Sequence, residues 1–348
     1  MSARENPFRL VVKSLLVAAL LVLLVLAVLR LLDLLLLAFG AVVIGILIRA
    51  LADGIGHYTF IAGRWRLYAA LLAIVAVLTA VGWIFGSQLG GDFSRLAATL
   101  AETLRELMQR VARLPGGVAL ASGLDRISLS GKDMVPHLLT MVNTITNLAI
   151  DLVLLLFGSI FFAANPSLYR RGLVQLVPKA HRDLADEALR DTGAALRQWM
   201  VGQSVMMLFI GVLTGTGLWL VGVPSAAALG VIAGILEAIP YFGPILSAFP
   251  ALAMAASDGL PTMLLALAVV TAVQQLEAAL FTPYVHKKVV SLPPALSVFG
   301  VVAMGILFGP LGLLLAAPLL VTVFVLVKRL YVEETLHTPT HVPGRDPE

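Results

Sequence analysis

Two glutamates lie in strongly apolar stretches of this sequence. Glu237 belongs to the apolar run 229–239 and precedes Pro240 by three residues, and Glu277 lies near the end of a second apolar run beside Gln274. A charged carboxylate inside a membrane costs several kcal/mol unless it is solvated, paired or protonated, so it is usually retained for a function. We expect Glu237, Glu277 or both to bind a proton or a cation, with Gln274 in the same site.

Structural roles would also explain these two acids. Glu277 is close in sequence to His286 and Lys287, so it could lie at the membrane interface rather than at depth. Glu237 could hydrogen-bond the irregular backbone that follows it. The sequence leaves both alternatives open.

The backbone next to Glu237 carries a pattern that occurs twice. Proline removes a backbone N–H and clashes with the preceding turn, and glycine permits unusual backbone conformations, so each copy predicts a broken helix. The broken apolar runs cover residues 224–256 and 293–327. We assign to the breaks, and to a substrate or ion site, Pro240, Tyr241, Phe242, Gly243 and Pro244 in the first run and Phe308, Gly309 and Pro310 in the second.

The composition places these breaks in a membrane. Of the 348 residues, 59% are hydrophobic and 13% are charged, whereas a soluble domain has about 25% charged residues. About 20 apolar residues form one spanning helix, so the chain has room for about six spans or more. The expected fold is all-α and polytopic.

Six apolar runs are long enough for complete spans. The first follows Arg4, Arg9 and Lys13, but it is longer than a signal-peptide core of about 7–15 residues, so we expect a retained helix. Arg30 and Asp33 predict a tight turn between the first two runs. The six runs are 10–29, 31–51, 67–85, 144–164, 199–221 and 261–281.

Two longer stretches are not apolar enough to span. Residues 97–114 carry apolar side chains at alternating spacings of three and four, which predicts an amphipathic helix that packs on this protein or on another subunit. Residues 167–198 mix basic and acidic side chains and predict a helix on the membrane surface. The fifth run is rich in glycine, which permits close helix approach.

The basic residues orient these elements. Most of them fall on the cytoplasmic side if the N-terminus is inside. Lys287, Lys288, Lys328 and Arg329 flank the second broken run, whereas the first has no Lys or Arg at either end. The two broken runs are too short for four spans, so we expect two re-entrant helical hairpins of opposite orientation.

A span and a hairpin followed by a span and a hairpin of opposite orientation form an inverted repeat. In secondary transporters such repeats place broken helices at mid-membrane, where they bind substrate or ions. The alternative is that Pro and Gly only kink packed helices. The expected organisation is three N-terminal helices (1–88), an extramembrane amphipathic segment (89–143), a fourth span with a cytoplasmic surface helix (144–198), a transport core (199–330) and a polar tail (331–348).

Several kinds of chemistry have no sequence support. There is no cysteine for thiol catalysis, and no P-loop, nucleophile elbow, dinucleotide turn or zinc motif occurs. The histidines have no ligand spacing. We expect no enzyme activity, no cofactor, no metal and no nucleic-acid partner.

Four segments resemble the autoinducer-2 exporter family of bacterial membrane permeases. They are LEAIPYFGP at 236–244, LWLVGVP at 218–224, LFGPLG at 307–312 and AAPL at 316–319. The resemblance covers most of the chain and implies a transporter-like α protein that forms a homo-oligomer, for example a pentamer. It implies export of a furanone signalling molecule, as assigned to some members, or sodium/proton antiport, as assigned to others. Glu277 matches the family pattern, whereas the family often has Asn at the position of Glu237.

The sequence therefore predicts a secondary transporter that exports a small polar solute, such as an autoinducer-2-like molecule, with proton or cation coupling. A monovalent cation/proton antiporter is the first alternative. An oligomeric membrane scaffold or channel-like assembly is the second. The expected location is the bacterial inner membrane, with several spans and both termini cytoplasmic, and the expected partners are the solute or ion and the lipid bilayer.

Overall fold

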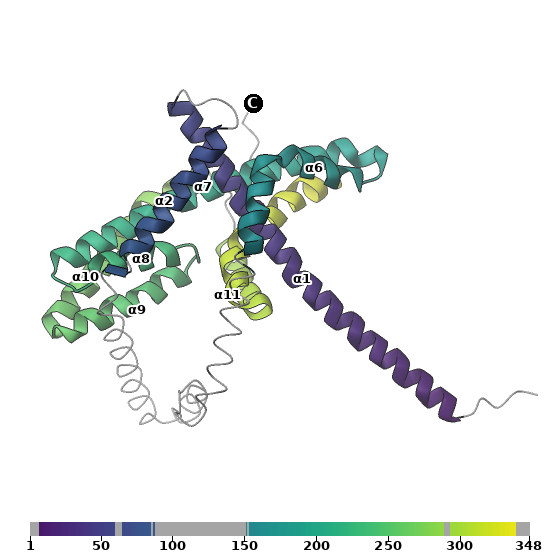
Figure 1. The fold of residues 1–348 in the computed structure, drawn as a ribbon, viewed down its shortest axis with the longest axis horizontal. Coiled ribbons are helices and arrows are strands. Elements are labelled where there is room, and N and C mark those ends of the chain that lie inside the picture. The colour runs from purple at the N-terminus through teal and green to yellow at the C-terminus, as the bar shows by residue number, and fades with distance from the viewer. Residues whose placement is uncertain are drawn as a thin grey trace, which may run out of the picture.

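The computed structural model describes residues 7–59, 65–84, 86–87, 151, 153–288 and 293–338. The described elements are all helical, which confirms the predicted all-α class. Figure 1 shows their arrangement. They are α1 (Pro7–Tyr58), α2 (Trp65–Ile84), a helix at Val153–Ala164, α6 (Pro166–Gln175), η2 (Lys179–His181), α7 (Arg182–Leu220), α8 (Ala226–Leu236), α9 (Phe242–Ser257), α10 (Leu260–Lys288), α11 (Pro294–Leu326) and η3 (Val327–Glu333).

Several of these helices could cross a membrane. By length and composition, five helices of the described part are candidates, and a sixth results if Val153–Ala164 and α6 form one broken span. α8 and α9 are apolar but shorter. The predicted polytopic membrane class is therefore supported. The amphipathic seam at 97–114 lies outside the described residues.

The first two predicted spans are one helix. α1 continues for 52 residues from Pro7 to Tyr58, so the predicted turn at Arg30 and Asp33 is wrong. At 1.5 Å per residue this helix is about 78 Å long. No proline interrupts it after Pro7, and leucine and alanine favour helix strongly, so two charged side chains do not end it.

The polar segment and the fifth predicted span are also joined. α7 runs for 39 residues from Arg182 to Leu220 and carries its charges in the first half and its apolar residues in the second. The prediction of a separate surface helix over residues 167–198 is therefore wrong for its second half. The first half forms α6, which bends by 89° from Val153–Ala164 at Asn165 and Pro166.

Glycines form the packing contact between α7 and α8. Gly211 and Gly215 of α7 face Gly230 and Gly234 of α8, and a Cβ on Gly230 would lie 2.6 Å from the Gly211 carbonyl oxygen. Small residues four apart on both helices let the two backbones approach closely. The glycine content of the fifth run had predicted close helix approach, and the structure confirms it for Gly211 and Gly215.

Gly230→Ala is expected to destabilise the protein. The added methyl meets backbone on both Gly211 and Gly215, and such overpacking costs about 1–3 kcal/mol, which exceeds the helix propensity gain of about 1 kcal/mol. The midpoint of thermal unfolding in detergent should fall. The matched control is Gly82→Ala in α2, where nothing lies within 4 Å, and its midpoint should stay the same or rise. An equal midpoint in both variants would contradict the packing argument.

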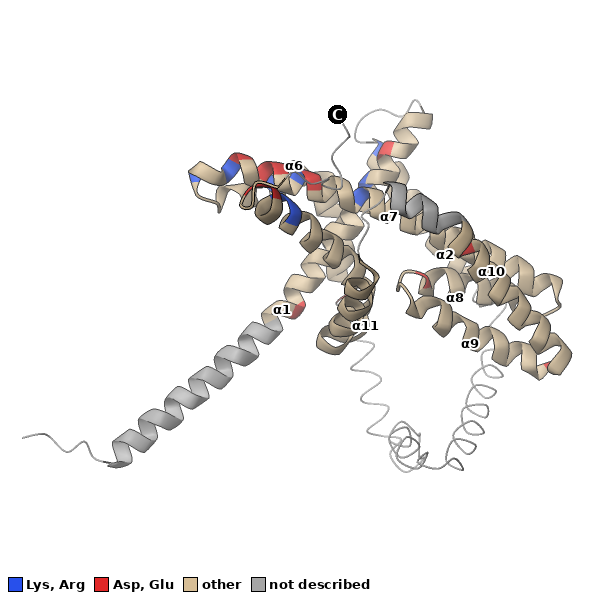
Figure 2. Cartoon of the chain, turned by 180° about the vertical axis from the view of Figure 1, so that it is seen from behind, with Lys and Arg blue, Asp and Glu red and all other residues tan. Residues whose placement is uncertain are grey.

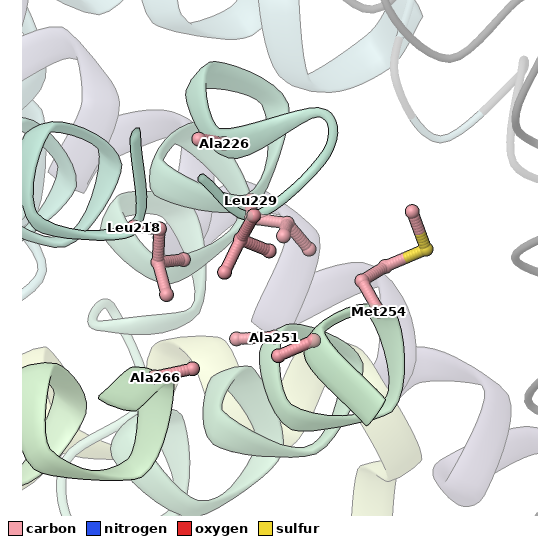
Figure 3. Close-up of a cluster of buried hydrophobic side chains, with 8 residues drawn as sticks. Leu218, Ala226, Leu229, Ala251, Met254 and Ala266 are labelled. Carbon is pink, nitrogen blue, oxygen red and sulfur yellow. The ribbon is translucent and has the colours of Figure 1, made fainter. Parts of the chain in front are cut away.

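α8 and α9 pack side by side with α10 against them. Their shared core contains the apolar residues Leu218, Ala226, Leu229, Ala251, Met254 and Ala266, which Figure 3 labels. Ala226 and Leu229 come from the start of α8, and Ala251 and Met254 from the end of α9, so the two helices are antiparallel. The predicted first broken run is thus a helical hairpin.

α11 also folds back on itself. Gly309 has φ 62° and ψ −144°, which no helix adopts. A Cβ on Gly300 would lie 2.7 Å from Leu320, and one on Gly305 would lie 2.7 Å from Leu313, so the two halves run antiparallel. A straight helix would separate residues 300 and 320 by about 30 Å. The predicted break at Gly309 is confirmed.

Charged residues are concentrated on α6, on the first half of α7 and on nearby parts of α1 and η3 (Figure 2). In the described residues, Arg329 of η3 lies close to Glu187 and Asp191 of α7 and to Glu333. Asp53 of α1 lies 3.0 Å from Arg197 of α7. This ion-pair layer ties the end of α11 and the C-terminal part of α1 to α7.

Candidate functional site

The connection between α8 and α9 is a tight turn. α8 ends at Leu236 and α9 begins at Phe242. Tyr241 has φ 67°, a left-handed conformation that is rare for a residue with a side chain. The N–H of Gly243 donates to the carbonyl of Ile239 at 2.8 Å, and a Cβ on Gly243 would clash with the backbone of Leu236. Only glycine therefore fits where the turn closes.

Glu237 is the first residue of this connection and is 5% exposed. Its backbone carbonyl, which has no partner within α8, accepts a hydrogen bond of 2.7 Å from Nε2 of Gln203 on α7. Its side-chain atom Oε2 is buried and forms no hydrogen bond within the described residues. The backbone carbonyl at this break is thus satisfied by Gln203.

The carboxyl group of Glu237 faces that of Glu277. Glu277 lies on α10, is half-buried, and is near enough to Glu237 for the two carboxyl groups to interact electrostatically. Its Oε2 is also buried and forms no hydrogen bond in the described part of the chain. Two ionised carboxylates are both hydrogen-bond acceptors, so one can hydrogen-bond the other only when one of them carries a proton.

The tip of the first hairpin shares an apolar cluster with α11. Ile239 and Phe242 belong to it, together with Val301, Met304 and Leu315 of the second hairpin. Phe308, beside the break in α11, packs against the same cluster. Figure 1 shows the α8–α9 connection directed toward α11. The two breaks thus lie on either side of one apolar contact.

A family model described as AI-2E family transporter matches residues 15–331. The chain belongs to the AI-2E transporter family. The match covers both hairpins and the carboxyl pair, and it confirms the resemblance found in the sequence. Together with the apolar helices, it indicates a multi-pass membrane protein of a transporter family.

Several curated relatives of this AI-2E family member carry the name putative transport protein. YrrI of Bacillus subtilis (strain 168) is 30% identical over 158 residues, which are 45% of each chain. YueF of the same strain is 27% identical over 201 residues, 58% of this chain and 53% of YueF. MT0215 of Mycobacterium tuberculosis (strain CDC 1551 / Oshkosh) is 33% identical over 186 residues, 52% of this chain and 49% of the relative. The chain spans about half the length of the relatives that it matches.

In this AI-2E family member the predicted site residues are placed unevenly. Glu237 and Glu277 come together, and Phe242 and Phe308 share the apolar cluster. Tyr241 and Pro310 are exposed, and Pro240 and Pro244 are half-buried at the first connection. Gln274 is half-buried one turn before Glu277 on α10. The structure therefore concentrates the polar chemistry at the two glutamates.

The repeated Phe-Gly-Pro tripeptide occupies two different structural positions in the AI-2E fold. In α11, Gly309 is the break itself. In the first hairpin the break precedes the tripeptide, because Tyr241 takes the left-handed conformation and Phe242, Gly243 and Pro244 form the first turn of α9. Proline is tolerated there because the first turn of a helix has no intrahelical N–H bonds.

Gln203, Gly230 and Gly234 are site-building residues that sequence reasoning missed. Gln203 is a lone amide in the apolar half of α7, and that isolation was the available signal. Gly230 and Gly234 repeat the four-residue spacing of Gly211 and Gly215, so their pairing was also readable. They let α8 approach α7 closely enough for Gln203 to reach Glu237.

A separate groove of about 820 Å³ runs between α2, α7 and α8. Its walls are mainly apolar residues and glycines, with Thr216 and Ser225 as polar members, and neither Glu237 nor Glu277 lines it. A polar solute would find few partners there. The carboxyl pair, rather than this groove, is the candidate functional site of the AI-2E family member.

Proposed function

We propose that the protein is a secondary transporter that exports a small polar solute, such as an autoinducer-2-like furanone, across the bacterial inner membrane. The α8–α9 hairpin and the α11 hairpin are its gating elements. The observation that carries this proposal is the proximity of buried Glu237, at the connection of the first hairpin, to half-buried Glu277 of α10. Membership of a transporter family supports it independently.

The carboxyl pair is the coupling site in this proposal. Two carboxylates in one buried place repel each other when both are charged, so together they hold a proton until the hairpin moves them apart or water reaches them. Within the described residues no third acidic or histidine side chain joins them to form a metal cluster. A proton needs no more ligands than the pair supplies, and a monovalent cation could replace it.

Flux measurements test the transport proposal. Purified protein in liposomes is given autoinducer-2 on one side, with and without an imposed pH gradient, and an internal pH dye records proton movement. Solute flux that depends on the gradient supports the proposal. Proton movement on addition of sodium or potassium, without solute flux, supports the alternative of a cation/proton antiporter, which the paired acids favour. Absence of any flux would leave the oligomeric scaffold as the better description.

We further propose that the two helical hairpins are re-entrant and face opposite sides of the membrane, as an inverted repeat, with both termini cytoplasmic. The basic residues after α11 and at the end of α10, and their absence around α8 and α9, support this orientation. A homo-oligomer is part of the same proposal, since the family resemblance implies one.

Single cysteines are expected to label from opposite sides. The chain has no cysteine of its own, so Ser257→Cys after the first hairpin and Ala295→Cys at the start of the second report on one position each. Both positions are exposed. A membrane-impermeant maleimide on intact cells should modify Ser257→Cys, and Ala295→Cys should react only after the cells are opened. Modification of both variants from one side would refute the opposed hairpins.

A further inference from the structure

α6 has a geometry that suits the surface of a bilayer. The helix before it, Val153–Ala164, is apolar and exposes large side chains such as Val153, Phe157 and Phe161, as a helix in lipid does. α6 turns from it by 89°. If the first helix enters the bilayer along its normal, α6 lies in the membrane plane.

The polar face of α6 is already occupied by the protein itself. Nε of Arg170 lies 3.0 Å from Oδ1 of Asp186 on α7. Arg182, at the start of α7, donates to the carbonyl of Gln175, the last residue of α6, at 3.0 Å and to that of Val177 just beyond the helix at 3.1 Å. α6 is therefore fixed to α7 through its polar groups.

The apolar face of α6 is largely uncovered, although the ring of Tyr169 packs against that of Phe162 with the ring centroids 4.3 Å apart. Leu168, Tyr169, Leu173 and Leu176 fall within a sector of about 140° at 100° per residue. All four are exposed, and Leu176 is 82% exposed. An apolar face that points away from the protein while the polar face points toward it is the reverse of a helix on a soluble protein.

Basic side chains border this face. Arg171 lies next to Leu168 on the helix surface, and its guanidinium group contacts only Ser167 in the described part of the chain. Lys179 follows α6 in η2, is exposed, and forms no ion pair within the described residues. Long basic side chains beside an interfacial apolar face can reach lipid phosphates.

We propose that α6 is an interfacial anchor that inserts Leu168, Leu173 and Leu176 into the acyl boundary and binds the phosphates of anionic phospholipids through Arg171 and Lys179. The charge complementarity and the right-angle bend select a lipid surface as the occupant of this face. The anchor fixes the first half of α7, and through it the second half, which carries Gln203 and packs against α8. This proposal does not depend on the transport proposal.

The test uses the full-length protein in vesicles with a spin label at Leu173→Cys. In phosphatidylcholine vesicles that contain phosphatidylglycerol, dissolved oxygen should relax the label and a water-soluble nickel complex should not. A label at Arg190→Cys, which is exposed on α7, is the control and should be open to nickel. In the Arg171→Gln, Lys179→Gln double variant, the ratio of protected to exposed Leu173 label at one fixed phosphatidylglycerol content should fall about tenfold or more.

Three outcomes would overturn the proposal. The first is a Leu173 label as open to nickel as the Arg190 label. The second is that the Leu173 label is protected equally well in vesicles of pure phosphatidylcholine, and equally well in the double variant. Anionic lipid would then play no part in holding α6 at the membrane. The third is that neither oxygen nor the nickel complex relaxes the Leu173 label, while its spectrum is broadened by a second label nearby. This face of α6 would then contact another copy of this chain.

Discussion

Glu237→Gln is expected to reduce gradient-driven transport by about tenfold to a hundredfold and to abolish its pH dependence. Coupling between two bound species is typically worth 1–3 kcal/mol, which corresponds to about 5–150-fold in affinity. Glutamine has the shape of glutamate but does not titrate, so the pair with Glu277 can no longer take up and release a proton. Solute uptake over a range of pH, with and without a gradient, measures the effect.

The fold of the Glu237→Gln variant should be unchanged. The carbonyl that Gln203 binds belongs to the backbone of residue 237 and is retained. Asp258→Asn is the matched control, because Asp258 follows α9 as an exposed acid. Its transport should equal that of the native protein. Equal unfolding midpoints in the three proteins would separate a loss of coupling from a loss of stability.

Glu277→Gln tests whether the two acids act as one site. If a proton is shared, either single variant removes the titration, and the double variant adds little to the loss. Independent sites would instead give losses that multiply. Unchanged transport and unchanged pH dependence in both single variants would end the coupling proposal while leaving transport itself open.

The helical hairpins were predictable from local sequence. Proline and glycine act within a few residues, and Gly309 breaks α11 where the sequence predicts it. The close approach of α7 and α8 was likewise readable from glycine spacing. The exact turn residue was not, since Tyr241 rather than glycine takes the left-handed conformation, and tertiary contacts of Phe242 and Gly243 enforce that choice.

From the sequence, Glu237 and Glu277 could be proposed only as two separate candidate residues and not as a pair. Glu237 and Glu277 are forty positions apart, and nothing local brings them together. α9 must return along α8, and α10 must pack on both before the side chains meet. The errors at α1 and α7 arise from local sequence instead. Charged residues were interpreted as helix ends, but the helices continue through them because the neighbouring residues favour helix strongly.

Arg329 shows that a charge pattern in the sequence also does not reveal the tertiary contacts of a basic residue. Lys328 and Arg329 together indicate a cytoplasmic end, and sequence alone treats them as equivalent. In the structure Lys328 lies over the ring of Phe324 at 4.8 Å, whereas Arg329 is 7% exposed and surrounded by acids. Glu187 and Asp191 of α7 and Glu333 of η3 all contact its guanidinium group.

Arg329→Gln is expected to lower the free energy of unfolding by about 3 kcal/mol. Removing one partner of a buried ion pair costs about 3–5 kcal/mol because the remaining charges lose their compensation, and the lower value applies since Glu187 is half exposed. Three acids would then face one another between η3 and α7. The midpoint of thermal unfolding in detergent, compared at low and high salt, measures the loss, and salt should restore part of it by screening.

Arg190→Gln is the control for this second variant. Arg190 pairs with Asp186 on the same helix and its side chain is 60% exposed, so its removal should cost about 0.5 kcal/mol or less. A small effect at Arg190 with a large one at Arg329 would show that the ion-pair layer holds the end of α11 against α7. Small effects at both would mean that the apolar contacts of Val321 and Val325 with α7 carry that interface, and the ion pairs would then have no structural role in fixing the second hairpin.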